Sequence, residues 1–368
     1  MQYKNLKLSK FESALFDMRL LFEQYGYSQY KVSKFEEYDL YAKNKAFLVS
    51  DNVLTFTDTT GHLMALKPDV TLSIVKNTVS GKGLTKLYYS ENVYRTQSSS
   101  QGFKEIMQTG LECVGEVDLY STAEVLSLAA KSLEAVSEDY ILDISHMGFI
   151  SSLINENVPA EYTKELLELI SQKNSAQAES LLSEIKVSQK AKNAILKLTT
   201  LYMPLSDALS ELEVLIQNNG MQEAFDELKS LDALMKHQNV KNLYLDFSVI
   251  NDMRYYNGII FSGYIKGVSG KVLSGGRYDN LLKRMKKNAC AIGFAFYLDT
   301  LQELVNTSAD TALDALVIYD ENVPAQKVMD EMEKAIAQGK TAKALKVFDE
   351  SLNAKEIIDL TEGGIKNG

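Results

Sequence analysis

The segments LTKLYYSENVYR (residues 84–95) and FKEIMQTGLECVG (residues 103–115) predict a pair of adjacent strands. Toward the N-terminus, short alternating runs from Tyr27 to about Leu66 are separated by turn residues and predict antiparallel sheet. Toward the C-terminus, strand signals return at residues 243–250, 255–267, 271–279 and 290–301. A sheet that begins before residue 151 is therefore expected to be completed after residue 240.

Helices are expected on either side of these strands. Ser9 and Glu12 form a capping box, and the apolar residues at 11, 15, 18 and 22 share one helix face, so a first helix is predicted to end at Gly26. Further helices are predicted over 70–77 and 123–136. The pattern as a whole is typical of an α+β fold.

The chain is predicted to contain four segments. Residues 151–240 carry almost no strand pattern and repeated Leu-Leu, Leu-Ile and Ala-Leu pairs, which predict an inserted helical subdomain. The insertion separates the first part of the main domain, residues 1–150, from its remainder, residues 241–305. Residues 306–368 predict a small α/β appendage, with a strand at DALVIYD, a helix at AQKVMDEMEKAIAQG, a further strand at ALKVFD and a Gly-rich tail.

Composition excludes several classes of protein. A hydrophobic fraction of 45% and four prolines in 368 residues are typical of a folded globular chain. The net charge of −10 argues against a protein that mainly binds nucleic acid, because such binding relies on Lys and Arg. The basic run KRMKK at 283–287 is interpreted as a solvated loop, with a phosphate contact as the alternative.

The location expected for the chain is the cytoplasm. The N-terminus lacks the apolar core of a signal peptide, and no stretch approaches twenty apolar residues, so neither export nor membrane insertion is expected. Cys113 and Cys290 each lie in an apolar run and are predicted to be buried, reduced thiols. The three histidines have no metal-ligand spacing and the common catalytic motifs are absent, so no metal, cofactor or catalytic residue is predicted.

A group of polar residues within or beside the strands could form a ligand site. Gln108 and Glu112 are an even number of residues apart and point to one face of a regular strand, with Gly110 between them leaving space for a ligand. An amide and a carboxylate suit an ammonium group, and Asp69 could supply a second carboxylate. The alternative is that these residues occupy a half-exposed strand surface.

Two glycine-containing segments also admit two interpretations. Tyr255 and Tyr256 precede Asn257-Gly258, which could be a strand that leads into a tight turn. The segment 275–277, Gly-Gly-Arg, could form a bulge or a close backbone approach with Arg277 in a salt bridge.

These segments, in this order, resemble histidyl-tRNA synthetases and their non-catalytic relatives from about Tyr25 to Leu301. The closest matches are LKPDVT, VYRTQ, QTGLE, RYYNG, SGGRYDNLL and AIGFAF. The resemblance implies a class II aminoacyl-tRNA synthetase-like fold, in which a six-stranded antiparallel sheet flanked by helices is interrupted by a helical insertion.

The resemblance also implies a histidine pocket. Asp69 and Thr71 match the acidic residue and the threonine that hold the substrate, and Gln108 and Glu112 match the pair that hold its amino group. Tyr255 and Tyr256 match the two tyrosines of the histidine-specific loop, and Arg95 matches the first arginine of the ATP site. The predicted histidine-binding set is Asp69, Thr71, Arg95, Gln108, Glu112, Tyr255 and Tyr256.

Other positions depart from the synthetase pattern. Thr300 and Asn251 stand where the family has arginines, and the loop after Arg95 has no further arginine, so amino-acid activation is not expected. The segment after Leu301 is shorter than an anticodon-binding domain, so no tRNA is expected.

The combination resembles the regulatory subunit of ATP phosphoribosyltransferase. That family is required for the activity of the short-form catalytic subunit, assembles with it as dimers within a hetero-octamer, and mediates feedback inhibition by histidine in the first step of histidine biosynthesis. The alternative interpretation is a divergent histidyl-tRNA synthetase-like enzyme that activates a small amino acid.

Overall fold

The computed structural model describes residues 8–45, 48, 52–78, 83–96, 102–249, 255–301, 313–346 and 353–361. The chain divides into two compact units, Lys10–Glu303 and a second unit made of Met1–Ser9 with Leu304–Gly368. Across the described ranges, no helix combines the length and apolar character needed to cross a membrane.

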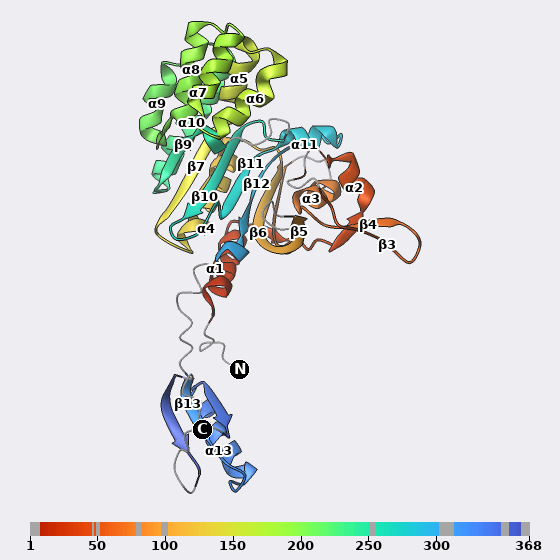
Figure 1. The fold of residues 1–368 in the computed structure, drawn as a ribbon, viewed down its shortest axis with the longest axis vertical. Helices are drawn as coiled ribbons and strands as arrows, with labels where there is room; N and C mark the ends of the chain where they lie inside the picture. Colours follow the sequence, from red (N-terminus) through yellow and green to blue (C-terminus); the bar gives the residue numbers. More distant parts are fainter. Residues whose placement is uncertain are drawn as a thin grey trace. The chain divides into compact units, whose positions relative to one another are not determined.

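A nine-stranded sheet forms the centre of the larger unit (Figure 1), in the order β1-β5-β6-β12-β11-β10-β7-β9-β8. Its six central strands pair antiparallel with one another, as predicted. These strands are β5 (Leu84–Thr96), β6 (Phe103–Gly115), β12 (Cys290–Tyr297), β11 (Leu273–Arg277), β10 (Ile259–Ile265) and β7 (Tyr140–His146). At the edges, β1 (Ser28–Gln29) and β9 (Leu243–Asp246) add parallel strands, and β8 (Tyr202–Pro204) pairs antiparallel with β9.

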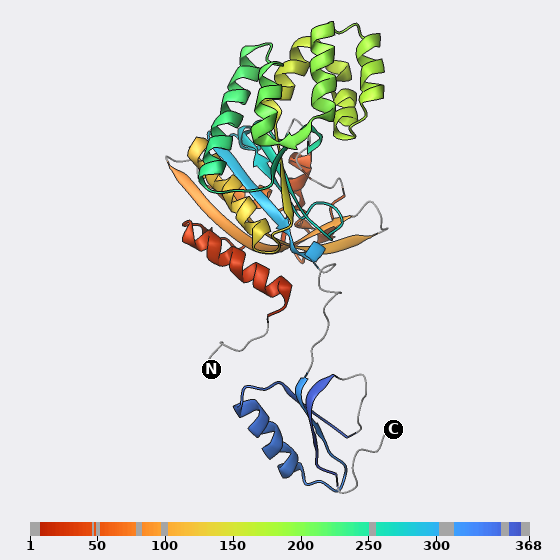
Figure 2. The same cartoon turned by 90° about the vertical axis from the view of Figure 1, so that its left-hand side faces the viewer.

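Two long helices cover one face of this sheet (Figure 2). α1 (Lys10–Gln24) buries Met18 and Phe22, in agreement with the predicted apolar face. α4 (Leu119–Glu134) begins four residues earlier than predicted, because the Asp118 side chain accepts a hydrogen bond of 2.8 Å from the backbone N–H of Ser121 and so caps the helix. The other face of the sheet is left for the polar side chains described below.

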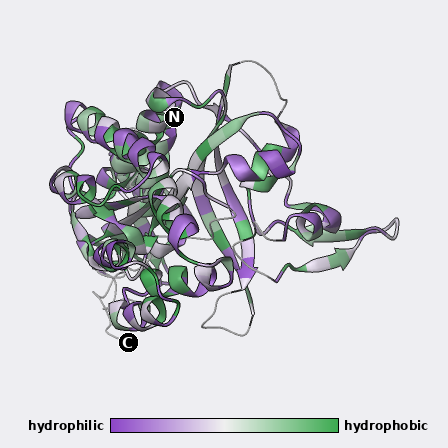
Figure 3. Cartoon of the chain, turned by 90° about the horizontal axis from the view of Figure 1, so that it is seen from above, coloured by the Kyte–Doolittle hydropathy of each residue, from purple (hydrophilic) through white to green (hydrophobic). Residues whose placement is uncertain are grey.

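The inserted segment is helical, as predicted. It contains α5 (Met147–Asn157), α6 (Ala160–Ser171), α7 (Ser175–Glu184), α8 (Gln189–Thr200), α9 (Leu205–Glu213) and α10 (Asn219–His237). Apolar residues of α10 are buried at spacings of three and four, and hydrophobic and hydrophilic colours alternate along the inserted helices in Figure 3. The short strand β8 joins the sheet and was not predicted.

A small sheet and three short helices lie beside the β5 and β6 end of the larger sheet. β2 (Phe35–Glu37), β4 (Leu63–Leu66) and β3 (Thr55–Thr57) are antiparallel, as predicted, whereas α2 (Tyr38–Lys43) was not foreseen. α3 (Thr71–Asn77) agrees with its prediction, and α11 (Asp279–Arg284) follows β11.

The basic run at 283–287 is not simply a solvated loop. The Lys287 ammonium group donates to the backbone carbonyls of Val75, Lys76 and Thr78, at the C-terminal end of α3. Carbonyls in the last turn of a helix generally lack a partner within the helix, and a cation also interacts favourably with the negative end of the helix dipole. Lys287 therefore has a structural role.

The smaller unit is an α/β fold, as predicted for the appendage. β13 (Leu313–Ile318) and α13 (Ala325–Ala337) agree with the predicted strand and helix. β14 (Ala342–Leu345) overlaps the strand predicted at 344–349 only in its last two residues, and residues 347–349 lie outside the described residues. β15 (Ala354–Asp359) adds a strand that was not predicted. Its sheet is parallel, in the order β14-β13-β15.

Both cysteines are free thiols. Cys113 is buried, as predicted, whereas Cys290 is only half-buried at the start of β12, so that prediction of burial was wrong.

Candidate functional site

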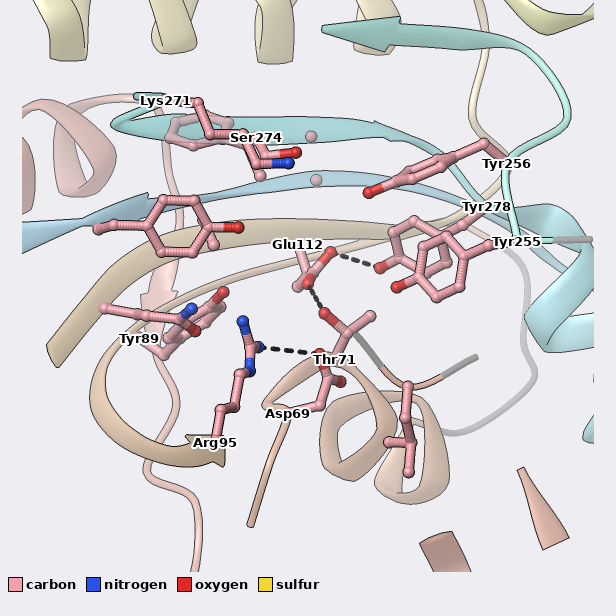
Figure 4. A pocket seen from close by; sticks show the side chains of 17 residues that line it. Asp69, Thr71, Tyr89, Arg95, Glu112, Tyr255, Tyr256, Lys271, Ser274 and Tyr278 are labelled. Atoms are coloured by element: carbon pink, nitrogen blue, oxygen red, sulfur yellow. Dashed lines mark hydrogen bonds and ion pairs between the residues drawn. The ribbon is translucent and has the colours of Figure 1, made fainter. Parts of the chain in front are cut away.

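A cavity of about 280 Å³ lies on the sheet face opposite α4. All of the predicted histidine-binding residues line it, namely Asp69, Thr71, Arg95, Gln108, Glu112, Tyr255 and Tyr256. They come from segments far apart in the sequence, and Figure 4 shows most of these side chains pointing toward one another. The alternative of a half-exposed strand surface is therefore wrong for Gln108 and Glu112, which are 1% and 2% exposed.

Glu112 lies at the centre of the polar network in the cavity. Its carboxyl oxygens accept hydrogen bonds from the Thr71 hydroxyl, at 2.6 Å, and from the Tyr278 hydroxyl (Figure 4). Burial raises the pKa of Glu112 to about 8; the two hydroxyl donors lower it and the nearby charge of Asp69 raises it. The carboxyl group is consequently poised to gain a cationic partner, since a cation would favour its charged form.

Gly293 provides the room for this carboxyl group. It lies directly opposite Glu112 on β12, and a Cβ at this position would overlap Oε2 of Glu112. The predicted role of Gly110 is wrong, because a Cβ there would meet the Phe294 carbonyl and the Tyr89 hydroxyl rather than open space. The room beside the Glu112 carboxyl group therefore comes from a glycine of the partner strand.

Asp69 and Arg95 form an ion pair at the entry to α3. Arg95 Nη2 lies 3.7 Å from Asp69 Oδ2, and Arg95 Nε donates to the Pro68 carbonyl at 2.6 Å. Asp69 Oδ1 also accepts from the backbone N–H of Leu72 at 2.9 Å. Burial raises the pKa of Asp69, and the charge of Arg95 opposes that effect. Asp69 thus already has partners, and it is a weaker candidate than Glu112 for holding a ligand ammonium group.

The tyrosine pair lies outside the strands, since β10 begins only at Ile259. The rings of Tyr255 and Tyr256 meet edge-on at 4.5 Å, and a Cβ on Gly276 would come within 2.8 Å of the Tyr256 ring. The predicted close approach at the glycine pair is confirmed, because the absence of a side chain at position 276 lets the tyrosine pack onto β11.

The chain after the tyrosine pair is held in place by Asp279. The Asn257 side-chain amide donates to Asp279 Oδ2 at 3.0 Å, and the Asp279 backbone N–H donates back to Asn257 Oδ1 at 2.8 Å. Arg277 Nε pairs with the same carboxylate at 2.9 Å, which confirms the predicted salt bridge. This clamp fixes the position from which the tyrosines reach the cavity.

The amide nitrogen of Gln108 has no hydrogen-bond partner among the described residues. This Nε2 atom is buried. A buried amide left without a partner is costly, so a ligand acceptor in the cavity would satisfy it.

Several lining residues were not predicted. Tyr89, Lys271, Ser274, Tyr278 and Tyr297 also face the cavity. Ser274 could have been found by alternation along its strand, since strand register places it on the face of Glu112 and Gln108. No sequence signal relates Tyr278 to Glu112, which are 166 positions apart.

Other predictions have mixed outcomes. Asn251 and residues 97–101 lie outside the described residues. Thr300 lies in the short helix η4 (Leu298–Leu301), where its hydroxyl donates to the Tyr297 carbonyl at 2.6 Å. Among the residues that the structure describes, no group of three or more His, Cys, Asp or Glu side chains could hold a metal ion.

Comparisons with known proteins agree with the resemblance. The histidyl-tRNA synthetase family matches residues 6–301. An ATP phosphoribosyltransferase regulatory subunit from Oceanobacillus iheyensis is 30% identical over 312 residues, which cover 82% of this chain and 76% of the relative.

Solved structures share the fold. A protein from Bacillus halodurans, described as an ATP phosphoribosyltransferase regulatory subunit/histidyl-tRNA synthetase, superposes with a TM-score of 0.77 at 21% identity and covers 98% of this chain and 97% of its own. An ATP phosphoribosyl transferase (HisG:HisZ) complex from Thermotoga maritima gives a TM-score of 0.62 at 21% identity and covers 79% of this chain and 98% of its own.

Proposed function

The chain belongs to the histidyl-tRNA synthetase family and, within it, to the ATP phosphoribosyltransferase regulatory subunits, and from this membership we propose that its cavity senses free histidine. In this proposal the chain activates a short-form catalytic subunit and makes that subunit sensitive to feedback inhibition by histidine. Three points remain predictions: the chain forms a dimer within a hetero-octamer, it binds no tRNA, and it is located in the cytoplasm.

The observation that carries the proposal is the gathering of seven predicted residues in one cavity. The cavity volume of about 280 Å³ lies just below the roughly 300–1,000 Å³ of sites for drug-sized ligands, which suits one amino acid. Glu112 offers a carboxylate and Gln108 its amide oxygen to the ammonium group of the ligand. Arg95 and Lys271 offer positive charge to the ligand carboxylate, which can also accept from Gln108 Nε2.

The charge balance of the cavity supports a non-catalytic role. Two cations, Arg95 and Lys271, and two acids, Asp69 and Glu112, are among its lining residues, and Arg95 is already paired with Asp69. Adenylate formation needs fixed positive charge around the triphosphate, and Thr300 offers a hydroxyl that is bonded to the backbone instead. We therefore propose that the chain activates no amino acid.

Regulation also sets a thermodynamic condition. A ligand shifts a quaternary equilibrium only by its difference in affinity for the two states, so histidine must bind the inhibited assembly more tightly than the active one. The solved complex from Thermotoga maritima has two components, HisG and HisZ, which supports a separate catalytic partner for this chain.

The test uses Glu112→Gln in the complex reconstituted with the short catalytic subunit. Removing one charge-assisted bond to the ligand costs about 1.5–3 kcal/mol, so the inhibitory histidine concentration should rise roughly ten- to a hundredfold. Phosphoribosyl-ATP formation without histidine should be unchanged. Glu105→Gln is the matched control, because Glu105 is an exposed residue of the same strand.

Three results would contradict the proposal. Unchanged inhibition by histidine in the Glu112→Gln complex would place the sensor elsewhere, and loss of activity without histidine would give the residue a role in assembly. Histidine-dependent exchange of pyrophosphate into ATP by the chain alone would support the alternative enzyme instead.

A further inference from the structure

The polar face of the sheet continues beyond the cavity to a second group of buried polar residues. Ser274 lines the cavity on β11, Ser262 is its partner on β10, and Asp143 is the partner of Ser262 on β7. With strands about 4.8 Å apart, Asp143 lies roughly 10 Å from Ser274 on the same face. Figure 1 shows β7 and β9 at the edge of the sheet nearest the inserted helices.

Four residues of β7 and β9 meet on this face. Asp143 is paired with Tyr244, and because the strands are parallel, Ser145 and Asp246 follow two residues later on the same face. Tyr202 lies directly opposite Asp246 on β8, and Lys173 reaches the group from the turn after α6. We call Asp143, Ser145, Lys173, Tyr202, Tyr244 and Asp246 the Asp143 cluster.

The positive charge within the cluster is already engaged. Asp246 Oδ2 lies 2.8 Å from Lys173 Nζ, and Asp246 Oδ1 accepts from the Ser248 backbone N–H at 2.8 Å. The one lysine of the cluster is therefore paired with Asp246. Asp143 lacks an ion-pair partner of its own among the described residues.

Two buried polar atoms of the cluster have no hydrogen-bond partner in the described part of the chain. Asp143 is 6% exposed, and among the residues that the structure describes its Oδ1 has no hydrogen-bond partner. The Oγ atom of Ser145, which is 0% exposed, likewise has none within those ranges. Unsatisfied polar atoms at such burial call for a missing donor.

Aromatic rings border the cluster. Tyr202 and Tyr244 stack at 5.3 Å with an interplanar angle of 18°, and the Lys173 ammonium lies 4.6 Å from the centre of the Tyr202 ring. Tyr202 is 43% exposed, so the cluster is close to solvent. Aromatic faces beside carboxylates attract organic cations, and the Tyr202 ring already contacts the Lys173 ammonium group.

We propose that the Asp143 cluster binds an organic cation that carries a guanidinium or primary ammonium group. Its N–H donors would satisfy Asp143 and Ser145, and its charge would balance the second carboxylate. Anions are disfavoured by the two acids, and a metal ion would find too few ligands, since the described residues contain no group of three metal-binding side chains here. This inference is independent of the proposed histidine site.

The electrostatics agree with this assignment. Burial and the charge of Asp246 raise the pKa of Asp143 to about 7, and Lys173 lowers it only in part. The other titratable side chains around Asp143 are the phenols of Tyr202, Tyr244 and Tyr264. Burial raises the pKa of Tyr202 to about 12 and the pKa of Tyr264 above its usual value.

The first experiment titrates the full chain with methylguanidinium chloride and follows backbone amide resonances of β7 and β9. We expect saturable shifts that require at least tenfold more ligand in Asp143→Asn and are weakened in Ser145→Ala. Asp139→Asn is the matched control, because Asp139 is exposed one residue before β7 and should leave the titration unchanged. Tetramethylammonium carries the charge without N–H donors and should bind much more weakly.

The second experiment identifies the source of the cation. If a basic side chain of the catalytic subunit fills the cluster, Asp143→Asn weakens the reconstituted complex and methylguanidinium competes with its assembly. If the ligand is a free amine, assembly is unchanged while the titration still depends on Asp143. The proposal is refuted if the wild-type chain shows no saturable shift and assembly is unaffected, or if Asp143→Asn and wild type respond alike in both experiments.

Discussion

Replacing Glu112 by Gln should remove most of the pH dependence of stability that the cavity creates. The carboxyl group is fully enclosed, and burial raises its pKa from 4.5 to about 8. Between pH 4.5 and about pH 8, the Glu112 carboxyl group is ionised in the unfolded chain but still protonated in the folded chain. Folding therefore becomes less favourable as the pH rises, and the loss is complete only above pH 8.

The magnitude follows from proton linkage. One proton bound only in the folded state corresponds to about 1.4 kcal/mol per pH unit, so wild type should lose stability at that rate between roughly pH 5.5 and 7.5 relative to the variant. The full rise in the pKa of Glu112, from 4.5 to about 8, corresponds to about 5 kcal/mol in the free energy of unfolding. Gln keeps the shape and an acceptor for the Thr71 hydroxyl, so the variant should be more stable than wild type at pH 8.

The assay is urea unfolding of the full chain followed by circular dichroism from pH 5 to 9. Glu105→Gln, on the exposed part of the same strand, should follow the wild-type curve. Saturating histidine should flatten the wild-type curve above pH 7, because its ammonium group favours the charged carboxylate. Parallel curves for wild type and Glu112→Gln would refute the reasoning.

Two further changes test the packing around the site. Gly293→Ala should destabilise the chain by more than about 2 kcal/mol and abolish histidine binding. The reason is that the new Cβ would overlap the Glu112 carboxyl group. A calorimetric titration with histidine that matches wild type would contradict this prediction. Lys287→Met should lower the free energy of unfolding by about 1–2 kcal/mol, because three carbonyls at the end of α3 lose their donor. Lys283 is exposed, so Lys283→Met is the control and should have little effect in the same urea assay.

The sequence by itself determined the elements and the chemistry of the site. Alternation predicted the central strands and three- and four-residue spacing predicted the inserted helices, because these periods depend only on local backbone geometry. The same rule placed Gln108 and Glu112 on one strand face, and the ordered resemblance supplied Asp69, Thr71, Arg95 and the tyrosine pair. All of them line the cavity.

Tertiary structure alone decided how that chemistry is held. Tyr278 donates to Glu112 across 166 positions, and Gly293 rather than Gly110 makes room for the carboxyl group, because strand register sets which residues lie opposite each other. The pKa of Glu112 and the partners of Asp69 likewise depend on burial and on charges brought near by folding. The alternation along one strand determines which face of the sheet a side chain points to. Its neighbours on that face are determined only by the order and register in which the strands pair.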